Sequence, residues 1–343
     1  MLRDCDHGIG EAGMLVGLGW SYEEVLPYYM KSERARLQNA DYRYHNTNGY
    51  QGVEDVYQSP LVEAFIQAGL EIGLPNWDYS TPTSSFGVST VQATIRNGHR
   101  DSAARSFLWP IQNRPNLDIV TSAFVTKVLI DEQTRETYGV QYEKLGKTYK
   151  VLAKREVILS AGPKEHLEEF GIPVLQDSSV GQNLHDHLTF PGLSFLINQD
   201  IDLNRDRAVA NIDRYIRNST GPWTSLGGVE GLGYIKTSHI PPNTIQTSLD
   251  HIPNVVASKS ISWLKLRSGN PYDRPLLYGN YFSDPNNEDI KTFIAAIRVV
   301  QRISATAAFQ KYGSRLNSRP MAGCKHLVFD SDQYWECALN LLL

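Results

Sequence analysis

Three segments of the chain place their apolar residues three or four positions apart, which is the spacing of one face of an α-helix. The first follows Ser21, a typical N-cap residue. The second follows Ser59 and opens with Pro60, because the first helical position does not need an N–H donor. The third begins at Asp289 and is expected to continue to about residue 304. The predicted apolar faces consist of Tyr22, Val25, Leu26, Tyr29 and Met30 in the first helix, Val62, Phe65, Ile66 and Leu70 in the second, and Ile290, Phe293, Ile294, Ile297 and Val300 in the third.

From residue 117 onwards the apolar residues alternate with polar ones, which is the period of a half-buried strand. We predict a small antiparallel meander with strands over 117–120, 124–130, 139–143 and 148–152. The apolar run 157–159 follows three charged residues and indicates a buried strand of a parallel sheet. A further strand is predicted over 263–267. This mixture predicts an α/β or α+β fold rather than a helical bundle.

Composition and charge exclude several classes of protein. The 343 residues are enough for two domains, and 41% hydrophobic with 20% charged residues is typical of a soluble globular protein. The 33 basic and 37 acidic residues give a net charge of −4. Because no long run of one sign occurs, no nucleic-acid partner is expected. No segment approaches the roughly 18 consecutive apolar residues of a membrane span.

The cysteines and the first residues do not indicate a cellular compartment. Cys5, Cys324 and Cys337 are too far apart for a Cys-x-x-Cys motif, and one thiol is left over if any two of them pair. Residues 1–20 contain acidic residues and glycines rather than a basic start and an apolar core, so no signal peptide is legible. A glycosylation sequon at Asn218 would matter only in a secreted protein.

Two motifs have a functional and a structural interpretation. Residues 8–13 match the Gly-x-Gly-x-x-Gly pattern of dinucleotide-binding loops, but residues 1–7 cannot form the buried strand that this loop requires, so we interpret the match as coincidence. His185 and His187 have a spacing that can bind a metal. Because no third ligand is evident nearby, we expect them to fix a turn and predict no metal site. No Gly-x-Ser-x-Gly elbow or Walker-type loop supports a hydrolase or an NTPase.

Longer motifs resemble one family of flavoproteins. The stretch 154–188 contains Val-Ile-Leu-Ser-Ala-Gly, Gly-Ile-Pro-Val and Val-Gly-Gln-Asn-Leu-His-Asp-His in this order. Residues 19–29 read Gly-Trp-Ser-Tyr-Glu-Glu-Val-Leu-Pro-Tyr-Tyr, and further matching segments lie at 94–108, 114–117, 123–128, 276–285 and 308–313. Together they resemble the glucose-methanol-choline (GMC) oxidoreductases over most of residues 19–315. The amino-acid sequences of the motifs are closest to those of the insect glucose dehydrogenase-like members.

The resemblance implies a fold, an activity and a cofactor. It implies a partial FAD-binding domain over residues 1–190 that includes the meander, joined to a partial antiparallel-sheet substrate domain over 191–343. Members of the family oxidise a CH–OH group of an alcohol or sugar by hydride transfer to FAD, which carries the redox chemistry. In this resemblance the backbone of Val125 matches the adenine contact of FAD. Ala161 and Gly162 match the chain that passes the dinucleotide.

The chain also departs from the family pattern. The glycine-rich pyrophosphate loop expected before residue 19 and the flavin-side segment expected after Gly162 are missing from the sequence, and the segment with the catalytic histidine would begin near residue 343. His166, His185, His187 and His326 do not match that position, so no catalytic residue is assigned. The alternative to an FAD-dependent dehydrogenase is therefore a catalytically inactive, truncated remnant that at most binds a ligand.

Overall fold

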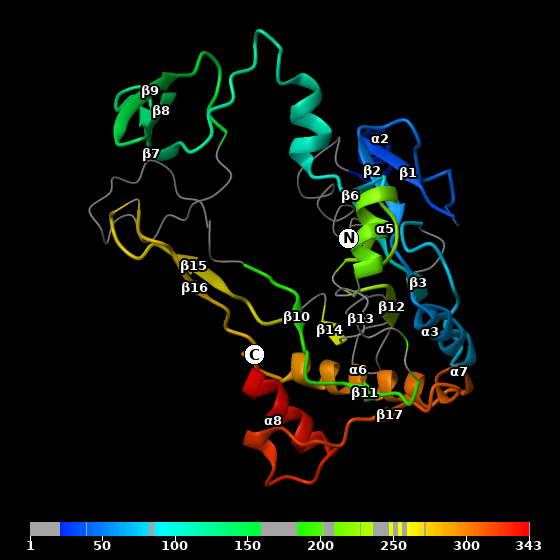
Figure 1. The fold of residues 1–343 in the computed structure, drawn as a ribbon. Helices are drawn as coiled ribbons and strands as arrows, with labels where there is room; N and C mark the ends of the chain where they lie inside the picture. The colour runs from blue at the N-terminus through cyan, green and yellow to red at the C-terminus, as the bar shows by residue number, and fades with distance from the viewer. Residues whose placement is uncertain are drawn as a thin grey trace. The chain divides into compact units, whose positions relative to one another are not determined.

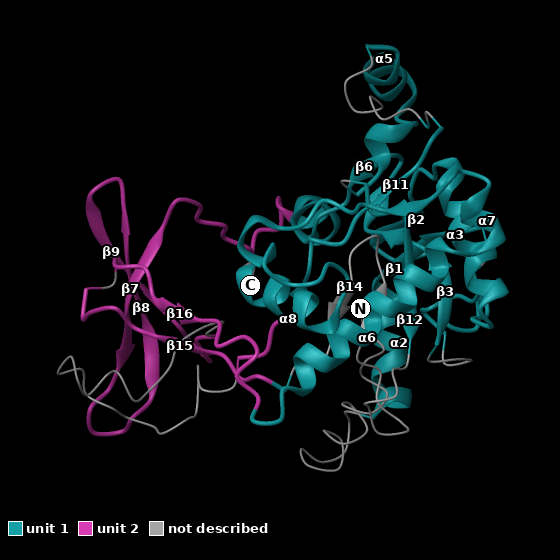
Figure 2. Ribbon diagram, turned by 90° about the horizontal axis from the view of Figure 1, so that it is seen from below, with its two compact units in different colours: residues 1–111, 187–259, 285–343 teal, residues 112–186, 260–284 magenta. Residues whose placement is uncertain are grey.

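The fold is mixed α and β and divides into two compact units. The computed structural model describes residues 21–38, 40–81, 86–158, 184–199, 201, 209–226, 228–235, 247–249, 253–255, 259–270 and 272–342. The first unit consists of residues 1–111, 187–259 and 285–343, and the second of residues 112–186 and 260–284 (Figure 2). Each unit is therefore built from segments that lie far apart in the sequence.

In the described part of the chain, the first unit contains the helices and four of the sheets. Its helices are α2 (Tyr22–Ser32), α3 (Pro60–Glu71), α5 (Val209–Asn218), α6 (Glu288–Ser304), α7 (Ala307–Gln310) and α8 (Asp332–Leu342), with a π-helical turn η1 (Ala104–Leu108) and short 3-10 helices η2 (Trp109–Ile111), η3 (Pro222–Thr224) and η4 (Ala322–Cys324). Its strands are β1 (Glu33–Arg36), β2 (Gln51–Asp55), β3 (Gly87–Thr90), β4 (Gln92–Ala93), β5 (Ile95–Arg96), β6 (His99–Arg100), β10 (Leu188–Thr189), β11 (Phe195–Leu196), β12 (Gly231–Ile235), β13 (Thr247–Leu249), β14 (Pro253–Val255) and β17 (Arg315–Leu316).

The largest sheet of this unit has the strand order β10-β14-β13-β12-β3, and all its neighbouring strands are antiparallel. Strand β3 lies at one end of this order and pairs with β12, with Thr90 opposite Gly231. A smaller sheet has the order β1-β2-β4, in which β1 and β2 run parallel. The large sheet thus combines one early strand with strands from the second half of the chain.

Helix α3 lies against this sheet because two glycines allow a close approach. A Cβ at Gly69 would lie 2.5 Å from Cγ2 of Val88 in β3, and a Cβ at Gly231 in β12 would lie 2.8 Å from Cδ1 of Phe65. Glycine in the middle of a helix is destabilising by about 0.5–1 kcal/mol relative to alanine, and the tight contact with the sheet offsets this. Larger side chains at either position would force α3 away from the sheet.

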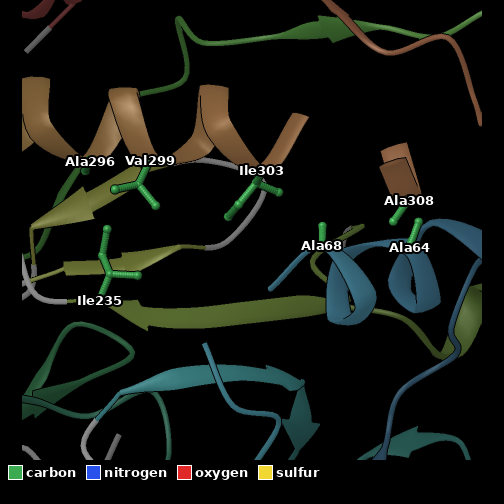
Figure 3. Close-up of a cluster of buried hydrophobic side chains, with 7 residues drawn as sticks. All are labelled: Ala64, Ala68, Ile235, Ala296, Val299, Ile303 and Ala308. Carbon is green, nitrogen blue, oxygen red and sulfur yellow. The ribbon is translucent and has the colours of Figure 1, made fainter. Parts of the chain in front are cut away.

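A cluster of small and branched side chains holds α3, α6 and α7 together (Figure 3). Helix α6 runs along one face of the large sheet, and α3 and α7 lie near its C-terminal end (Figure 1). The cluster consists of Ala64, Ala68, Ile235, Ala296, Val299, Ile303 and Ala308. The alanines let the helices approach each other closely, so the core of this unit depends on small residues at these positions.

Two carboxylates, the exposed Glu71 and the buried Glu230, fix the ends of these helices. Glu71, at the end of α3, accepts hydrogen bonds from the backbone N–H groups of Ala307 (2.7 Å) and Ala308 (2.9 Å) at the start of α7. Glu230 is almost fully buried and accepts a 2.7 Å hydrogen bond from the N–H of Ser59, just before α3. Because the N–H groups at a helix start have no partner within the helix, both contacts satisfy donors that would otherwise be unpaired.

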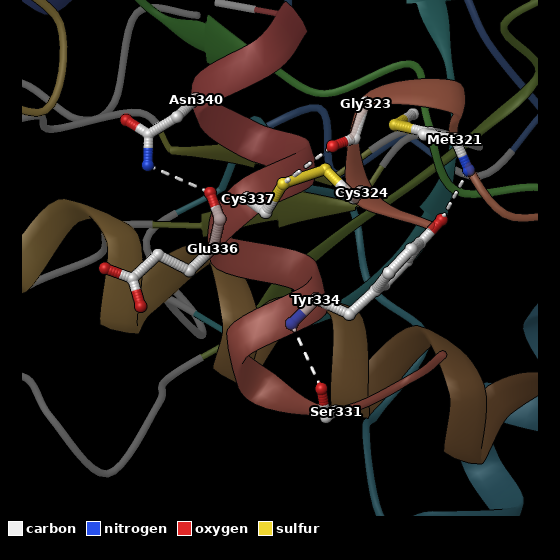
Figure 4. The surroundings of a disulfide bond; sticks show 8 residues. All are labelled: Met321, Gly323, Cys324, Ser331, Tyr334, Glu336, Cys337 and Asn340. Atoms are coloured by element: carbon white, nitrogen blue, oxygen red, sulfur yellow. Dashed lines mark hydrogen bonds between the residues drawn. A yellow bond between two sulfur atoms is a disulfide. The ribbon is translucent and has the colours of Figure 1, made fainter. Parts of the chain in front are cut away.

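Helix α8 is tied to the preceding turn by a disulfide bond between Cys324 and Cys337 (Figure 4). Cys324 is fully buried at the end of η4, and Cys337 lies in α8. Next to the disulfide, the hydroxyl of Tyr334 accepts a 3.0 Å hydrogen bond from the N–H of Met321. Two of the three cysteines are therefore paired, and the third, Cys5, lies outside the described residues.

We expect the double substitution Cys324→Ser and Cys337→Ser to lower the free energy of unfolding by about 3 kcal/mol, because the disulfide closes a short loop in the unfolded chain. Urea unfolding of the two proteins under non-reducing conditions measures the difference. Thiol titration in denaturant should give one thiol before reduction and three after it. Three reactive thiols before reduction would contradict the pairing.

The second unit is a three-stranded antiparallel meander of β7 (Phe124–Ile130), β8 (Thr137–Lys144) and β9 (Lys147–Leu152), together with the antiparallel pair β15 (Trp263–Lys265) and β16 (Leu276–Tyr278). All side chains of β9 are exposed, and Leu129 is the buried residue of β7. The meander therefore buries little apolar surface of its own.

The predicted helices are confirmed with small differences. The N-cap Ser21 and Glu24 form a reciprocal capping box at the start of α2, and the predicted apolar face of α2 is its less exposed face. Helix α6 begins at Glu288, one residue before the predicted start, and Phe293 and Ile297 are fully buried in it. In α3, however, Leu70 is 47% exposed, because the alanines and Gly69 take the buried positions.

Some strand predictions are wrong. Residues 117–120 form no strand, and Ile119 and Val120 are about half exposed because no neighbouring chain pairs with them in the described part of the unit. Val157 and Ile158 are irregular, and Ile158 is 81% exposed, whereas Leu159 lies outside the described residues. The strand predicted over 263–267 ends at Lys265. Apolar alternation alone did not reveal whether a pairing partner exists.

Candidate functional site

Val125 is the predicted site residue that the structure places. It lies in β7, which forms one edge of the meander, and its Cα is opposite that of Tyr142 in β8. The register shifts between Val125 and Lys127, so the pairing is irregular at this point. An edge strand has one row of backbone N–H and C=O groups that its own sheet does not use, and an irregularity exposes more of them. The Val125 side chain is itself 51% exposed.

An exposed aromatic pair lies directly beside Val125. The ring of Phe124 stacks on that of Tyr272, with 4.8 Å between the centroids and 18° between the planes. The hydroxyl of Tyr272 donates a short hydrogen bond to the carboxylate of Glu143 in β8, and this bond raises the pKa of Tyr272 above its usual value. Both rings remain 44–52% exposed. This edge of the second unit therefore offers backbone groups and flat apolar surface together.

A second stacked pair lies on β15 and β16. The rings of Trp263 and Tyr278 are parallel to within 17°, with centroids 3.6 Å apart, and the Lys265 ammonium lies 4.6 Å from the Trp263 ring. A cation at this distance is attracted by the face of the indole. The sequence predicted only a strand in this segment. No sequence pattern indicated that Trp263 would stack on Tyr278.

A titratable group with a clearly perturbed pKa is His45 in the first unit. Its ring is 4% exposed and lies between two carboxylates, with Nδ1 2.8 Å from Glu33 and Nε2 2.9 Å from Asp78. Burial alone would lower the pKa of His45, but the hydrogen bonds and charges of Asp78 and Glu33 outweigh it and raise the pKa to about 9. Because both ring nitrogens are engaged and the ring is buried, His45 is a structural cation rather than a proton-transfer group.

A buried carboxylate organises the motif at residues 94–108. Asp101 is fully buried, accepts a 2.6 Å hydrogen bond from the N–H of Gly52, and lies 2.8 Å from the guanidinium of Arg96. Arg105 approaches its second oxygen to 3.8 Å. The motif thus fixes the β5–β6 hairpin against β2, which is a role in the fold.

The remaining candidates of the sequence are placed as follows. Ala161, Gly162, His166 and the glycine pattern at residues 8–13 lie outside the described residues. His185 and His187 are exposed, and Asp186 between them accepts a 3.2 Å hydrogen bond from Tyr281. Within the described ranges, no three or more acidic, histidine or cysteine side chains are grouped for a metal ion. None of the helices in the described part combines the length and the apolar composition needed to cross a bilayer.

Comparison with known proteins relates both units to one family. A family model described as GMC oxidoreductase matches residues 15–189. Glucose dehydrogenase [FAD, quinone] from Drosophila pseudoobscura pseudoobscura is 32% identical over 94% of this chain, and the match covers 58% of that protein. Alcohol dehydrogenase [acceptor] from Pseudomonas putida is 31% identical over 86% of this chain and 60% of its own length. The chain thus spans about three fifths of the length of these curated relatives.

Solved structures support the fold. An FAD-dependent oxidoreductase from Chaetomium thermophilum matches with a TM-score of 0.80 and 21% identity over 96% of this chain and 70% of that one. A formate oxidase from Aspergillus oryzae matches with a TM-score of 0.83 and 20% identity over 98% of this chain and 69% of that one. At this level of identity the similarity concerns the arrangement of the backbone.

Proposed function

Because the chain belongs to the GMC oxidoreductase family, we propose that it contributes the flavin-binding scaffold of an oxidoreductase that oxidises a CH–OH group of an alcohol or sugar. The observation that carries this proposal is the family match over residues 15–189, which includes the exposed β7 edge at Val125. The names of two relatives, a glucose dehydrogenase and an alcohol dehydrogenase, both denote oxidation of hydroxyl groups. They support the substrate class.

We propose FAD as the cofactor, held in part by backbone. FAD accepts a hydride and so supplies the redox chemistry that protein side chains lack. The backbone of Val125 would contact the adenine, and Ala161 and Gly162 would line the path of the dinucleotide. The half-exposed rings of Phe124 and Tyr272 next to Val125 suit a flat heteroaromatic group, because aromatic rings stack on one another. In this proposal residues 1–190 bind the cofactor and residues 191–343 contribute to the substrate side.

A second candidate is ligand binding without turnover. It is favoured by the state of two histidines in the described residues. His45 lies between two carboxylates, and His99 is hydrogen-bonded to Tyr215 (2.9 Å) and Ser219 (3.0 Å). Both ring nitrogens of each are engaged in hydrogen bonds, so neither histidine is assigned as the base that accepts a proton from an alcohol. Flavin binding without reduction by any sugar or alcohol would support this candidate.

The Val125 backbone provides a test of the cofactor proposal. We expect the purified chain to retain FAD absorbance after removal of free cofactor. Val125→Pro, which removes an N–H, should weaken FAD binding by about 3- to 10-fold, because a lost hydrogen bond is worth about 0.5–1.5 kcal/mol. Val125→Ala keeps the backbone and should change the dissociation constant by less than about 2-fold. Fluorescence titration of FAD measures both.

The matched control is Val151→Pro. Val151 lies in β9, the opposite edge strand of the same meander, and is also about half exposed. It disturbs the sheet in a comparable way but lies outside the proposed adenine contact. Equal loss of FAD binding in both proline variants would show that the meander and not the Val125 edge matters, and a colourless wild-type protein would refute the cofactor proposal for this chain.

A further inference from the structure

The end of helix α5 presents an asparagine to solvent within a glycosylation sequon. Asn218 is the last residue of α5, and its side chain is exposed. Asn218-Ser219-Thr220 is the only Asn-x-Ser/Thr triplet in the sequence in which x is not proline. Within the described part of the chain the Asn218 amide takes part in no hydrogen bond, whereas the side chains of the next two residues are engaged.

The residues after Asn218 hold this turn in place. Ser219 has the left-handed φ of 54°, which ends the helix, and its N–H donates to the carbonyl of Tyr215 at 2.8 Å. The Ser219 hydroxyl is 3.0 Å from Nε2 of His99, in the β6 strand. Gly98 lies so close to the carbonyl of Ser219 that any Cβ there would clash. The turn is therefore fastened on its inner side by the hairpin β5–β6, and Asn218 faces outward.

Thr220 supplies the hydroxyl that the sequon requires. It is exposed, and its Oγ1 accepts a 3.2 Å hydrogen bond from Nε of Arg214, six residues earlier in α5. Gly221 follows with a φ of 92°, so the chain turns away from the helix directly after the sequon. Surface turns of this kind are the usual places of attached glycans.

An independent feature indicates the compartment. The disulfide between Cys324 and Cys337 requires an oxidising environment, such as the lumen of the endoplasmic reticulum or the extracellular space, because cytosolic thiols are kept reduced. The oligosaccharide is attached to asparagine in that same lumen. The disulfide and the sequon, which lie in different elements, thus point to one cellular route.

We propose that Asn218 carries an N-linked oligosaccharide. In this step the amide nitrogen Nδ2 of Asn218 forms a bond to C1 of the first sugar of a lipid-linked oligosaccharide diphosphate. The bond between C1 and the phosphate oxygen breaks, the lipid diphosphate leaves with the electron pair, and Nδ2 loses one proton. No oxidant or reductant takes part. The modification goes beyond the proposed flavin chemistry and does not depend on it.

The test is production of the chain through the secretory pathway of a eukaryotic host, followed by mass spectrometry before and after treatment with peptide N-glycosidase. We expect a carbohydrate mass on the wild-type chain that the enzyme removes, leaving aspartate at position 218. Asn218→Gln and Thr220→Ala should both abolish this mass, the second without touching the acceptor itself. Thr220→Ser should retain it, because serine also completes a sequon.

Asn211→Gln is the matched control, since Asn211 lies in the same helix but outside any sequon. It should leave the carbohydrate in place. The proposal is overturned if the wild-type chain carries no carbohydrate while a known glycoprotein from the same cells does, or if the mass remains in Asn218→Gln. Because Asn218 and Thr220 are exposed and Asn211 is only partly buried, circular dichroism spectra of the variants should match that of the wild type.

Discussion

Replacing His45 by leucine is expected to lower the free energy of unfolding by about 3–5 kcal/mol, because it leaves two largely buried carboxylates without their cation. Glu33 and Asp78 approach the ring from opposite sides, at 2.8 and 2.9 Å. His45 is only 4% exposed, so water cannot take over its role. Urea unfolding at pH 7 measures the loss. His326, an exposed histidine of the same unit, is the control, and His326→Leu should change stability by less than about 0.5 kcal/mol.

The same contact predicts how the stability of the wild-type protein depends on pH. The pKa of His45 is raised from 6.5 to about 9 in the folded protein, so the folded state holds this proton more tightly than the unfolded chain. The stabilisation is fully present below pH 6.5 and is lost as the pH rises through about 9. It amounts to about 3 kcal/mol. In His45→Leu this decline should be absent, and an equal decline in both proteins would contradict the assignment to His45.

A second substitution separates charge from packing at this site. Asp78→Asn in the wild-type background removes one partner of a buried cation, whereas in the His45→Leu background it removes an uncompensated negative charge. Asp78→Asn should therefore destabilise the wild type and destabilise the leucine variant less, or stabilise it. Equal effects in the two backgrounds would mean that His45 and Asp78 do not interact.

Replacing Trp335 by alanine is the other substitution with a large expected effect, a loss of about 3–5 kcal/mol in the free energy of unfolding. Trp335 lies in α8, is 2% exposed, and meets the ring of Phe190 edge-on at 6.2 Å. Its indole N–H donates a 2.7 Å hydrogen bond to Asp330. Alanine leaves a cavity among these aromatic rings, since a packed interior closes only in part around a missing side chain. Calorimetry or denaturant unfolding measures the loss.

Two variants define what Trp335 contributes. Trp335→Phe keeps most of the ring and should cost less than half as much as alanine, because Asp330 still accepts hydrogen bonds from Arg298 (2.6 Å) and Gln301 (2.7 Å). Trp109→Ala in the same unit removes a tryptophan that is 61% exposed and should change stability by less than about 1 kcal/mol. A small effect of Trp335→Ala would contradict the buried position of α8.

The local elements of this fold were predictable because their signals lie within a few residues of each other. Ser21 and Glu24 form a cap from neighbouring positions, and the alternation of residues 124–152 includes its own turns. Residues 117–120 show the same alternation but have no partner strand among the residues that the structure describes, which a local pattern cannot reveal. Sequence patterns therefore predicted an element correctly where its hydrogen-bonding partner lies close by in the sequence.

The contacts that organise the candidate site were not predictable in this way. The position of Val125 in a strand followed from its neighbours, but its aromatic companion Tyr272 lies far along the chain. The bond of Glu230 to Ser59 and the position of His45 between two carboxylates also join residues from different elements. Their spacing in sequence carries no period, so only the assembled fold brings them together. The predictions for Ala161 and Gly162 stay predictions.

The place of β3 in the large sheet affects how the chain folds during its synthesis on the ribosome. Its partner strand β12 begins at Gly231, long after β3 ends at Thr90. At roughly 5–20 residues per second, the intervening chain takes on the order of ten seconds to synthesise. During this interval the edge of β3 that pairs with β12 has no native neighbour, and the apolar side of α3 lacks α6 and α7, which are synthesised later still. Such edges pair readily with other chains. We therefore expect chaperones to bind the nascent chain until nearly its whole length has left the ribosome.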